Sequence, residues 1–104
     1  MPAKFQVSIT RSAEKDIEEI WTYIAADSPA DALKFILRLE EQAATLEQFP
    51  QRCPLIPENA LLGTENRRLL YGNYRTIFRI EGRIVYVLRI IHGARLLDSA
   101  VLET

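Results

Sequence analysis

The sequence predicts an α+β fold with the element order β-α-α-β-β-β. In this fold an antiparallel-dominated sheet carries an N-terminal helical hairpin on one face. Two observations support the prediction: apolar residues recur at helical spacing between residues 12 and 48, and residues 66–91 show three strand patterns separated by tight turns. The 104 residues, of which 48% are hydrophobic, suit a single domain, which we expect to span residues 1–104.

The first strand is predicted by Phe5, Val7 and Ile9, which alternate with polar residues. A helix follows, and Ser12 is expected to cap it. The apolar stripe of this helix comprises Ala13, Ile17, Ile20, Trp21 and Ile24. Four acidic residues lie mostly off the stripe and are expected to face solvent: Asp16, Glu18, Glu19 and Asp27.

The second helix begins after Ser28, because Ser28 can cap it, Pro29 suits its first position and Asp31 favours its first turn. We expect it to run to about Gln48. Its buried stripe comprises Ala32, Phe35, Ile36, Leu39, Ala43 and Leu46. The short linker makes the two helices an antiparallel hairpin, with Trp21 near its centre.

An irregular segment follows and continues to Gly63, with Leu61 and Leu62 able to anchor it on the core. Three prolines impose it: Pro50, Pro54 and Pro57. Strands are then predicted over residues 66–71, 74–80 and 83–91, with turns at Gly72-Asn73 and Glu81-Gly82. Residues 96–104 show no strong pattern, and a short helical turn or pairing with a partner are both compatible with Leu97 and Val101.

Composition limits the classes of function. The formal net charge of −1 argues against a stand-alone nucleic-acid binder, so any such contact is local or the target is a protein. No apolar run is long enough for a membrane span, and we expect no signal peptide. The single cysteine, Cys53, fits a reducing cytoplasm and is expected to be a buried or idle thiol. We expect no metal site and no cofactor.

Positive charge is concentrated in one stretch of the chain. Residues 67–95 contain seven arginines, no lysine and one acidic residue, which gives a local charge of +6. Arginines on half-buried strands present fixed, planar donors that suit phosphate, carboxylate or the acidic residues of a partner.

The alternation of side chains along strands predicts where these arginines lie. Arg75 and Arg79 should emerge together on the face of the sheet away from the helices, and Arg89 joins them from the last strand. His92 and Arg95 follow where that strand ends. The candidate constellation is therefore Arg67 or Arg68 with Arg75, Arg79, Arg89, His92 and Arg95. It is either a solvated face paired with the acidic helices or a concave basic patch that binds or cleaves a polyanion.

An ordered set of motifs resembles the RelE/ParE toxin superfamily over nearly the whole chain. The motifs are Ala13-x-x-Asp16-Ile17-x-x-Ile20-Trp21-x-Tyr23-Ile24, Leu46-x-x-Phe49-Pro50, Arg68-x-Leu70, Tyr74-Arg75-x-Ile77-Phe78-Arg79-Ile80 and Val87-Leu88-Arg89-Ile90-Ile91-His92-Gly93-Ala94-Arg95. The resemblance implies a toxin of a type II toxin–antitoxin module, also called a plasmid stabilisation protein. It implies a ParD/RelB-like antitoxin whose C-terminal segment wraps the toxin, and it assigns operator DNA binding to that antitoxin rather than to this chain.

The superfamily has two activities. RelE-like members cut messenger RNA in the ribosomal A site without a metal, whereas ParE-like members poison DNA gyrase by binding. This chain has no aromatic residue after His92, where the nucleases carry a tyrosine, and all of its lysines lie at or before Lys34. Arg75 nevertheless matches the arginine that nucleases place at the scissile phosphate, and His92 matches a catalytic histidine of some members.

We therefore predict a ParE-like gyrase inhibitor that binds its target or antitoxin through Arg68, Arg75, Arg79, Arg89, His92 and Arg95. The alternative is a RelE-like endonuclease acting on the ribosome and mRNA, with Arg75, His92 and Arg95 as catalytic candidates. A further alternative is a non-toxic member that binds only the antitoxin.

Overall fold

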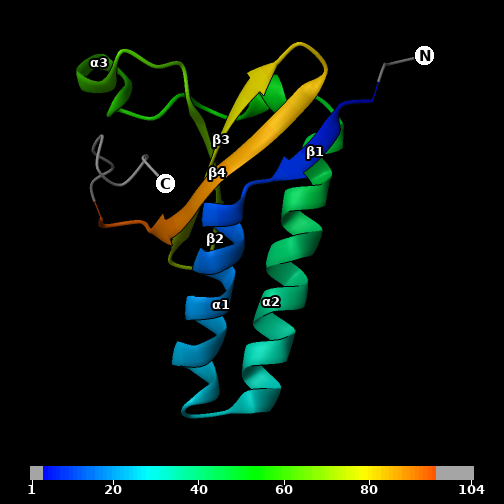
Figure 1. The fold of residues 1–104 in the computed structure, drawn as a ribbon, viewed down its shortest axis with the longest axis vertical. Helices are drawn as coiled ribbons and strands as arrows, with labels where there is room; N and C mark the ends of the chain where they lie inside the picture. The colour runs from blue at the N-terminus through cyan, green and yellow to red at the C-terminus, as the bar shows by residue number, and fades with distance from the viewer. Residues whose placement is uncertain (1–3, 96–104) are drawn as a thin grey trace.

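The computed structural model describes residues 4–95 and confirms the predicted order of elements. The fold consists of β1 (Gln6–Ile9), α1 (Arg11–Ala25), α2 (Pro29–Ala44), α3 (Asn59–Leu62), β2 (Arg67–Tyr71), β3 (Tyr74–Glu81) and β4 (Ile84–His92). Two short 3-10 helices, Thr45–Glu47 and Pro50–Arg52, lie between α2 and α3 (Figure 1). The interpretations of residues 96–104 lie outside the described residues.

The strands form one mixed sheet in the order β1-β4-β3-β2. β1 pairs with β4 in parallel, whereas β2 with β3 and β3 with β4 are antiparallel, so the antiparallel-dominated sheet is confirmed. Gly72 and Gly82 begin the two hairpin turns with φ values of 57° and 60°, which glycine adopts without steric cost. The second turn is Gly82-Arg83, one residue later than predicted.

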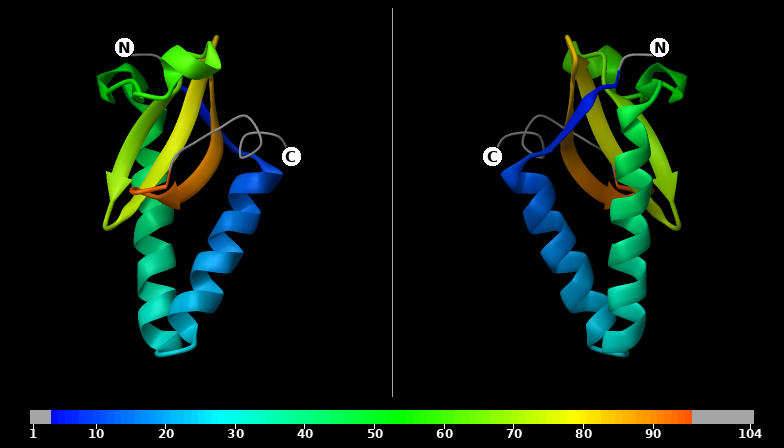
Figure 2. Two further views of the ribbon diagram at one scale, coloured as in Figure 1. Left: turned by 90° about the vertical axis from the view of Figure 1, so that its left-hand side faces the viewer. Right: turned by 90° about the vertical axis from the view of Figure 1, so that its right-hand side faces the viewer.

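Both long helices lie on one face of the sheet and project beyond it (Figures 1 and 2). Thr10, not Ser12, caps α1: its Oγ1 accepts from the backbone N–H of Ala13 at 3.2 Å and donates to the carbonyl of Val87 at 2.8 Å. Thr10 therefore joins the helix to the sheet, which Ser12 does not. The predicted cap of α2 is confirmed, since Ser28 Oγ accepts from the N–H of Asp31 at 3.2 Å.

The C-terminal end of α2 differs from the prediction. The α-helix ends at Ala44 rather than at about Gln48, and the chain continues as a 3-10 turn through Glu47. Phe49 then takes a left-handed conformation with φ of 48°, which directs the chain into the turn that starts at Pro50. Within residues 4–95, no helix is long and apolar enough to cross a membrane.

The main core lies between the helical hairpin and the sheet. Its fully buried large side chains include Leu39, Leu46, Phe78, Val85 and Val87. Trp21 was expected near the centre of the hairpin, but it is 42% exposed. The distal part of the hairpin extends past the sheet (Figure 2), and Trp21 follows Ile20, the last buried residue of α1.

The other face of the sheet is partly covered by residues 54–63, which we call the covering segment. Its Ile56 and Leu62 pack against Ile77 and Ile91. Of the two predicted anchors, Leu62 makes this contact, whereas Leu61 is 92% exposed. The side chain of Asn59 fixes the segment, because its amide donates to the carbonyl of Asn66 and its Oδ1 accepts from Asn66 and Thr64.

Two leucines on α2 test this assignment of the core. Leu39→Ala should lower the free energy of unfolding by about 2–5 kcal/mol, because Leu39 is 1% exposed and its removal leaves a cavity. Leu37→Ala should cost less than about 1 kcal/mol, because Leu37 is 50% exposed on the same helix. Urea denaturation followed by far-UV circular dichroism measures both, and equal losses would contradict the described packing.

Candidate functional site

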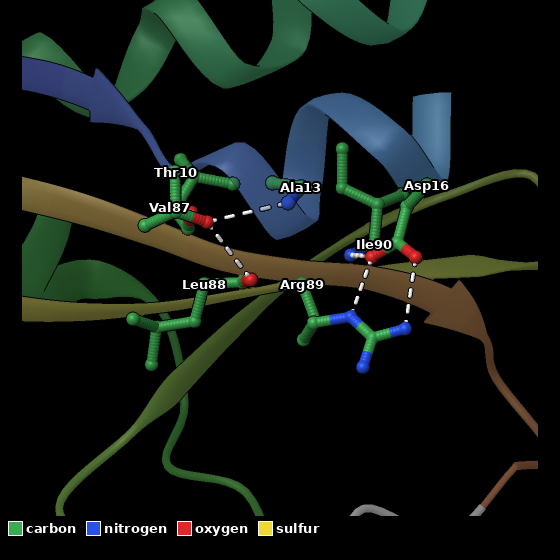
Figure 3. A network of polar contacts seen from close by, with 7 residues as sticks. All are labelled: Thr10, Ala13, Asp16, Val87, Leu88, Arg89 and Ile90. Atoms are coloured by element: carbon green, nitrogen blue, oxygen red, sulfur yellow. Dashed lines mark hydrogen bonds and ion pairs between the residues drawn. The ribbon is translucent and has the colours of Figure 1, made fainter. Parts of the chain in front are cut away.

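Arg89 forms a bidentate ion pair with Asp16 of α1. Its Nε donates to Oδ2 at 2.7 Å and its Nη2 donates to Oδ1 at 2.8 Å (Figure 3). The side chains are only 13% and 7% exposed, and the hydrogen bond to Asp16 raises the pKa of Arg89 above its ordinary value despite the opposing effect of burial. Arg89 is therefore bound inside the molecule rather than presented to a ligand.

The position of Asp16 follows from the length of β1. The β1–β4 pairing ends with Ile9 opposite Val87, so beyond that point no strand among residues 4–95 pairs with this edge of β4. Side chains replace the strand: Thr10 Oγ1 donates to the carbonyls of Val87 and Leu88, and Asp16 Oδ2 accepts from the N–H of Ile90 at 2.8 Å (Figure 3). The prediction that Asp16 faces solvent is wrong, because its carboxylate closes this edge.

Arg75 is bound in the same manner beneath the covering segment. Its Nη1 and Nη2 donate to Oε1 and Oε2 of Glu58 at 3.0 and 2.6 Å, and Nη2 also donates to the carbonyl of Arg95 at 2.7 Å. The side chains of Arg75 and Glu58 are 8% and 6% exposed. Arg75 thus joins the covering segment and the end of β4 to the middle of β3.

The expectation that Arg75 and Arg79 emerge together is wrong for Arg75. The two residues do lie on the face away from the helices, but the covering segment brings Glu58 over Arg75. Arg79 lies beyond this cover: its side chain is 51% exposed, forms an ion pair with Glu81 at 3.2 Å and lies over the ring of Tyr86. Arg79 is consequently available to a ligand, whereas Arg75 is not.

Three further arginines gather around Cys53, at the end of the sheet that carries Arg79. Burial raises the pKa of the Cys53 thiol, while the positive charges of Arg52, Arg67 and Arg68 oppose this increase. The thiol is 4% exposed, as expected for a buried cysteine. Arg67 Nη1 donates to the carbonyls of Cys53 at 2.6 Å and Gln51 at 3.2 Å, so this arginine is fixed by neutral groups.

His92 and Arg95 lie at the opposite end of the strands. The His92 ring meets Tyr74 edge-on with ring centroids 5.8 Å apart, and its Nδ1 accepts from the N–H of Ala94 at 3.2 Å. A hollow of about 190 Å³ lies here, and its polar lining is supplied by Asp16, Glu19, Tyr23, Tyr74, His92 and Arg95.

The structure does not bring Arg75 and His92 to one place. His92 is paired with Tyr74 in the register of β3 and β4 and contacts its ring, whereas Arg75 points to the opposite face. The predicted constellation therefore separates into three parts. Arg75 and Arg89 are bound internally. One end of the sheet carries half-buried Arg67 and Arg68 with exposed Arg79, and the opposite end carries His92 and Arg95. Among residues 4–95 no group of His, Cys, Asp and Glu could hold a metal ion.

Two residues of these networks were missed from the sequence. Asp16 lies three residues after Ala13 and four before Ile20, so helical spacing places it on the buried stripe and was a usable signal. Glu58 lies in a proline-rich segment without periodicity, and no local pattern indicates that it pairs with Arg75.

Comparison with known families decides the identity of this fold. The family described as the ParE toxin of the type II toxin–antitoxin system, parDE, matches residues 7–97. The chain belongs to this family. It is therefore a toxin of a type II toxin–antitoxin system, and the resemblance found in its motifs is confirmed.

Solved structures share the fold of this ParE-family toxin. A structure of the chromosomal ParDE toxin–antitoxin system from P. aeruginosa matches at 24% identity and a TM-score of 0.68, covering 86% of this chain and 97% of that chain. The RelBE2 toxin–antitoxin complex from Mycobacterium tuberculosis matches at 23% identity and a TM-score of 0.61, covering 86% and 98%. These likenesses establish the fold alone. No curated protein matches the sequence.

The burial of the Asp16–Arg89 pair predicts how removal of the Asp16 carboxylate affects the stability of the toxin. Asp16→Ala should lower the free energy of unfolding by about 3–5 kcal/mol, because it leaves the guanidinium of Arg89 buried without its carboxylate. It also removes the partner of the Ile90 N–H. Glu18→Ala, an exposed acidic residue on the same helix, is the control and should change stability by less than about 0.5 kcal/mol.

Chemical denaturation at neutral pH measures both variants. If Asp16→Ala were as stable as Glu18→Ala, the carboxylate would not be closing the edge of β4.

Proposed function

We propose that this ParE-family toxin inhibits DNA gyrase by binding it in its cleaved-DNA state, and that a ParD/RelB-like antitoxin neutralises the toxin in the cytoplasm. The family supports a type II toxin, and the internal pairing of its central arginines supports binding rather than catalysis. The two solved structures described above are of toxin–antitoxin systems, which supports an antitoxin as partner. The antitoxin, rather than this chain, would contact operator DNA.

The observation that carries the proposal is the Glu58–Arg75 contact. A metal-independent ribonuclease needs a cation free to stabilise charge on the phosphate and a proton-transfer group at the same phosphate. Here both Nη atoms of Arg75 are bound to a buried carboxylate. His92, the single histidine of the chain, pairs with Tyr74 and lies on the other face of the sheet. A phosphate would have to displace Glu58 before it could reach Arg75.

The RelE-like ribosome-dependent endonuclease stays as the second candidate because of one contact. Glu58 and Arg75 are an acid–base group and a cation in direct contact, at 2.6 Å between Oε2 and Nη2, and a glutamate serves proton transfer in some RelE-like nucleases. If the covering segment moved, these two residues would be available to ribosome-bound mRNA, with His92 and Arg95 at the adjacent strand end. A non-toxic member that binds only an antitoxin would show neither activity.

The buried pairs also decide which variants can test function. A combined Arg75→Ala and Arg89→Ala variant would leave Glu58 and Asp16 buried without their cations, so its loss of toxicity would report unfolding. His92 is a better probe, because it is exposed and its removal leaves no buried charge.

The purified chain should therefore inhibit supercoiling by gyrase and increase the cleaved-DNA complex, and His92→Ala should inhibit within about twofold of the unchanged toxin. The physical reason is that a binding inhibitor needs no proton transfer at His92. Supercoiling of a relaxed plasmid measures the first activity, and cleavage of mRNA on purified ribosomes measures the second.

Ribosome-dependent cleavage that His92→Ala abolishes, together with unimpaired gyrase, would replace the proposal with the endonuclease. Inactivity in both assays would indicate the non-toxic member.

A further inference from the structure

A second hollow lies at the end of the sheet that carries the exposed arginines. Its volume is about 320 Å³, and we call it the arginine hollow. It is lined by Gln51, Leu55, Glu65, Arg67, Arg79 and Ile80. It thus lies between the start of β2, the far half of β3 and the segment that follows α2, at the opposite end of the strands from His92.

The cations at the arginine hollow are held in place without being neutralised by buried carboxylates. Arg67 donates to the carbonyls of Cys53 and Gln51. Arg52 next to it donates to the carbonyls of Gln48 and Phe49 and to the hydroxyl of Thr45. Carbonyl and hydroxyl oxygens fix a guanidinium but leave its net charge, so both residues keep a positive field here. Fixed arginines lose less side-chain entropy when a carboxylate or phosphate binds.

At the same place, no strand in the described part of the chain pairs with the last residues of β3 on the β2 side. The pairing of β2 with β3 begins with Arg67 opposite Phe78, so β3 extends past β2 from Arg79 to Glu81. Leu55, which pairs with Arg67 on the other side of β2, lines the same hollow and is 52% exposed. An uncovered strand edge next to an exposed apolar side chain is a surface to which an extended peptide can add by main-chain hydrogen bonds.

The composition of the arginine hollow favours a peptide over a nucleic acid. Leu55 and Ile80 supply apolar contacts that a phosphate backbone does not use. The whole chain carries a net charge of −1, which opposes long-range attraction to a nucleic acid. Arginine beside tyrosine and leucine is instead typical of protein interfaces.

We propose that the arginine hollow docks an extended, acidic segment of the protein that the toxin inhibits. This inference rests on the proposed function, which identifies that protein as gyrase. The acidic side chains of the segment meet Arg79 and Arg67, its apolar side chains contact Leu55, and its backbone pairs with the free edge of β3.

Arg79 is the residue to change, because its side chain is 51% exposed and its ion pair with Glu81 is on the surface. Arg79→Ala should bind purified gyrase at least about tenfold more weakly than the unchanged toxin, a loss of about 1.4 kcal/mol. Inhibition of supercoiling should weaken by a similar factor. Arg38→Ala removes an exposed arginine from α2 and is the matched control, which should bind as the unchanged toxin does.

The readouts are the dissociation constant by isothermal titration calorimetry, the half-inhibitory concentration in the supercoiling assay and the melting temperature of each variant. The melting temperature of Arg79→Ala should match that of Arg38→Ala. Raising the salt concentration should weaken binding of the unchanged toxin more than binding of Arg79→Ala, because a screened charge pair is lost in the variant.

Three results would overturn the inference. If Arg79→Ala binds and inhibits gyrase as well as Arg38→Ala does, the hollow does not dock the target. If Arg79→Ala binds gyrase normally but loses affinity for a linear DNA duplex, the hollow is a nucleic-acid surface. If the unchanged toxin neither binds nor inhibits gyrase, both the proposed function and this inference are wrong. This result is distinguishable from the other two because it is obtained with the unchanged toxin, before any variant is compared.

Discussion

The carboxylate of Asp16 connects α1 to the sheet where β4 extends beyond its parallel neighbour β1. β1 is only four residues long, and its last pair is Ile9 with Val87. β4 continues for five residues beyond Val87. An edge of this kind would leave backbone groups of β4 without partners under α1, where water is excluded. Asp16 accepts from one of them and binds Arg89 at the same time, with Thr10 completing the edge. The contact thus links α1 to the part of β4 that leads to His92, between residues more than seventy positions apart in the sequence.

A second buried pair performs the corresponding task beneath the covering segment. Glu58 binds Arg75, and Arg75 binds the carbonyl of Arg95, so the covering segment and the end of β4 are tied to β3. Such pairs add little net stability compared with apolar residues, because both charges lose their hydration. They do specify geometry, since a mispositioned segment would leave a charge buried alone. The two pairs thus explain why a strand-rich half with seven arginines folds without an exposed basic sheet.

The sequence allowed the elements to be predicted closely and the arginine positions only in part. Apolar periodicity is a local signal, so the helices, the three late strands and the cap at Ser28 follow from it. Helical spacing could have indicated the burial of Asp16. The cap at Thr10 and the bonds of Asp16 to Arg89 and Ile90 depend instead on where β1 ends relative to β4, a distance in space that periodicity does not contain. The alternation along β3 placed Arg75 and Arg79 on the correct face. It could not reveal that residues 54–63 fold over half of that face, because Pro54 and Pro57 suppress any regular pattern there.

The concentration of positive charge in residues 67–95 has a different interpretation once the two buried ion pairs are taken into account. Arg75 and Arg89 are neutralised by Glu58 and Asp16, which lie outside the arginine-rich stretch, so five of its seven arginines remain. At one end of the strands Arg67 is held by carbonyl oxygens and Arg79 by an exposed carboxylate, while Arg83 lies over the ring of Phe5. Arg95 lies at the opposite end, beside His92. A phosphate-cleaving centre needs convergent groups at one point, whereas a docking surface needs fixed charges spread over an area. The arrangement that remains is of the second kind, which is why a binding toxin agrees better with this fold than a nuclease does.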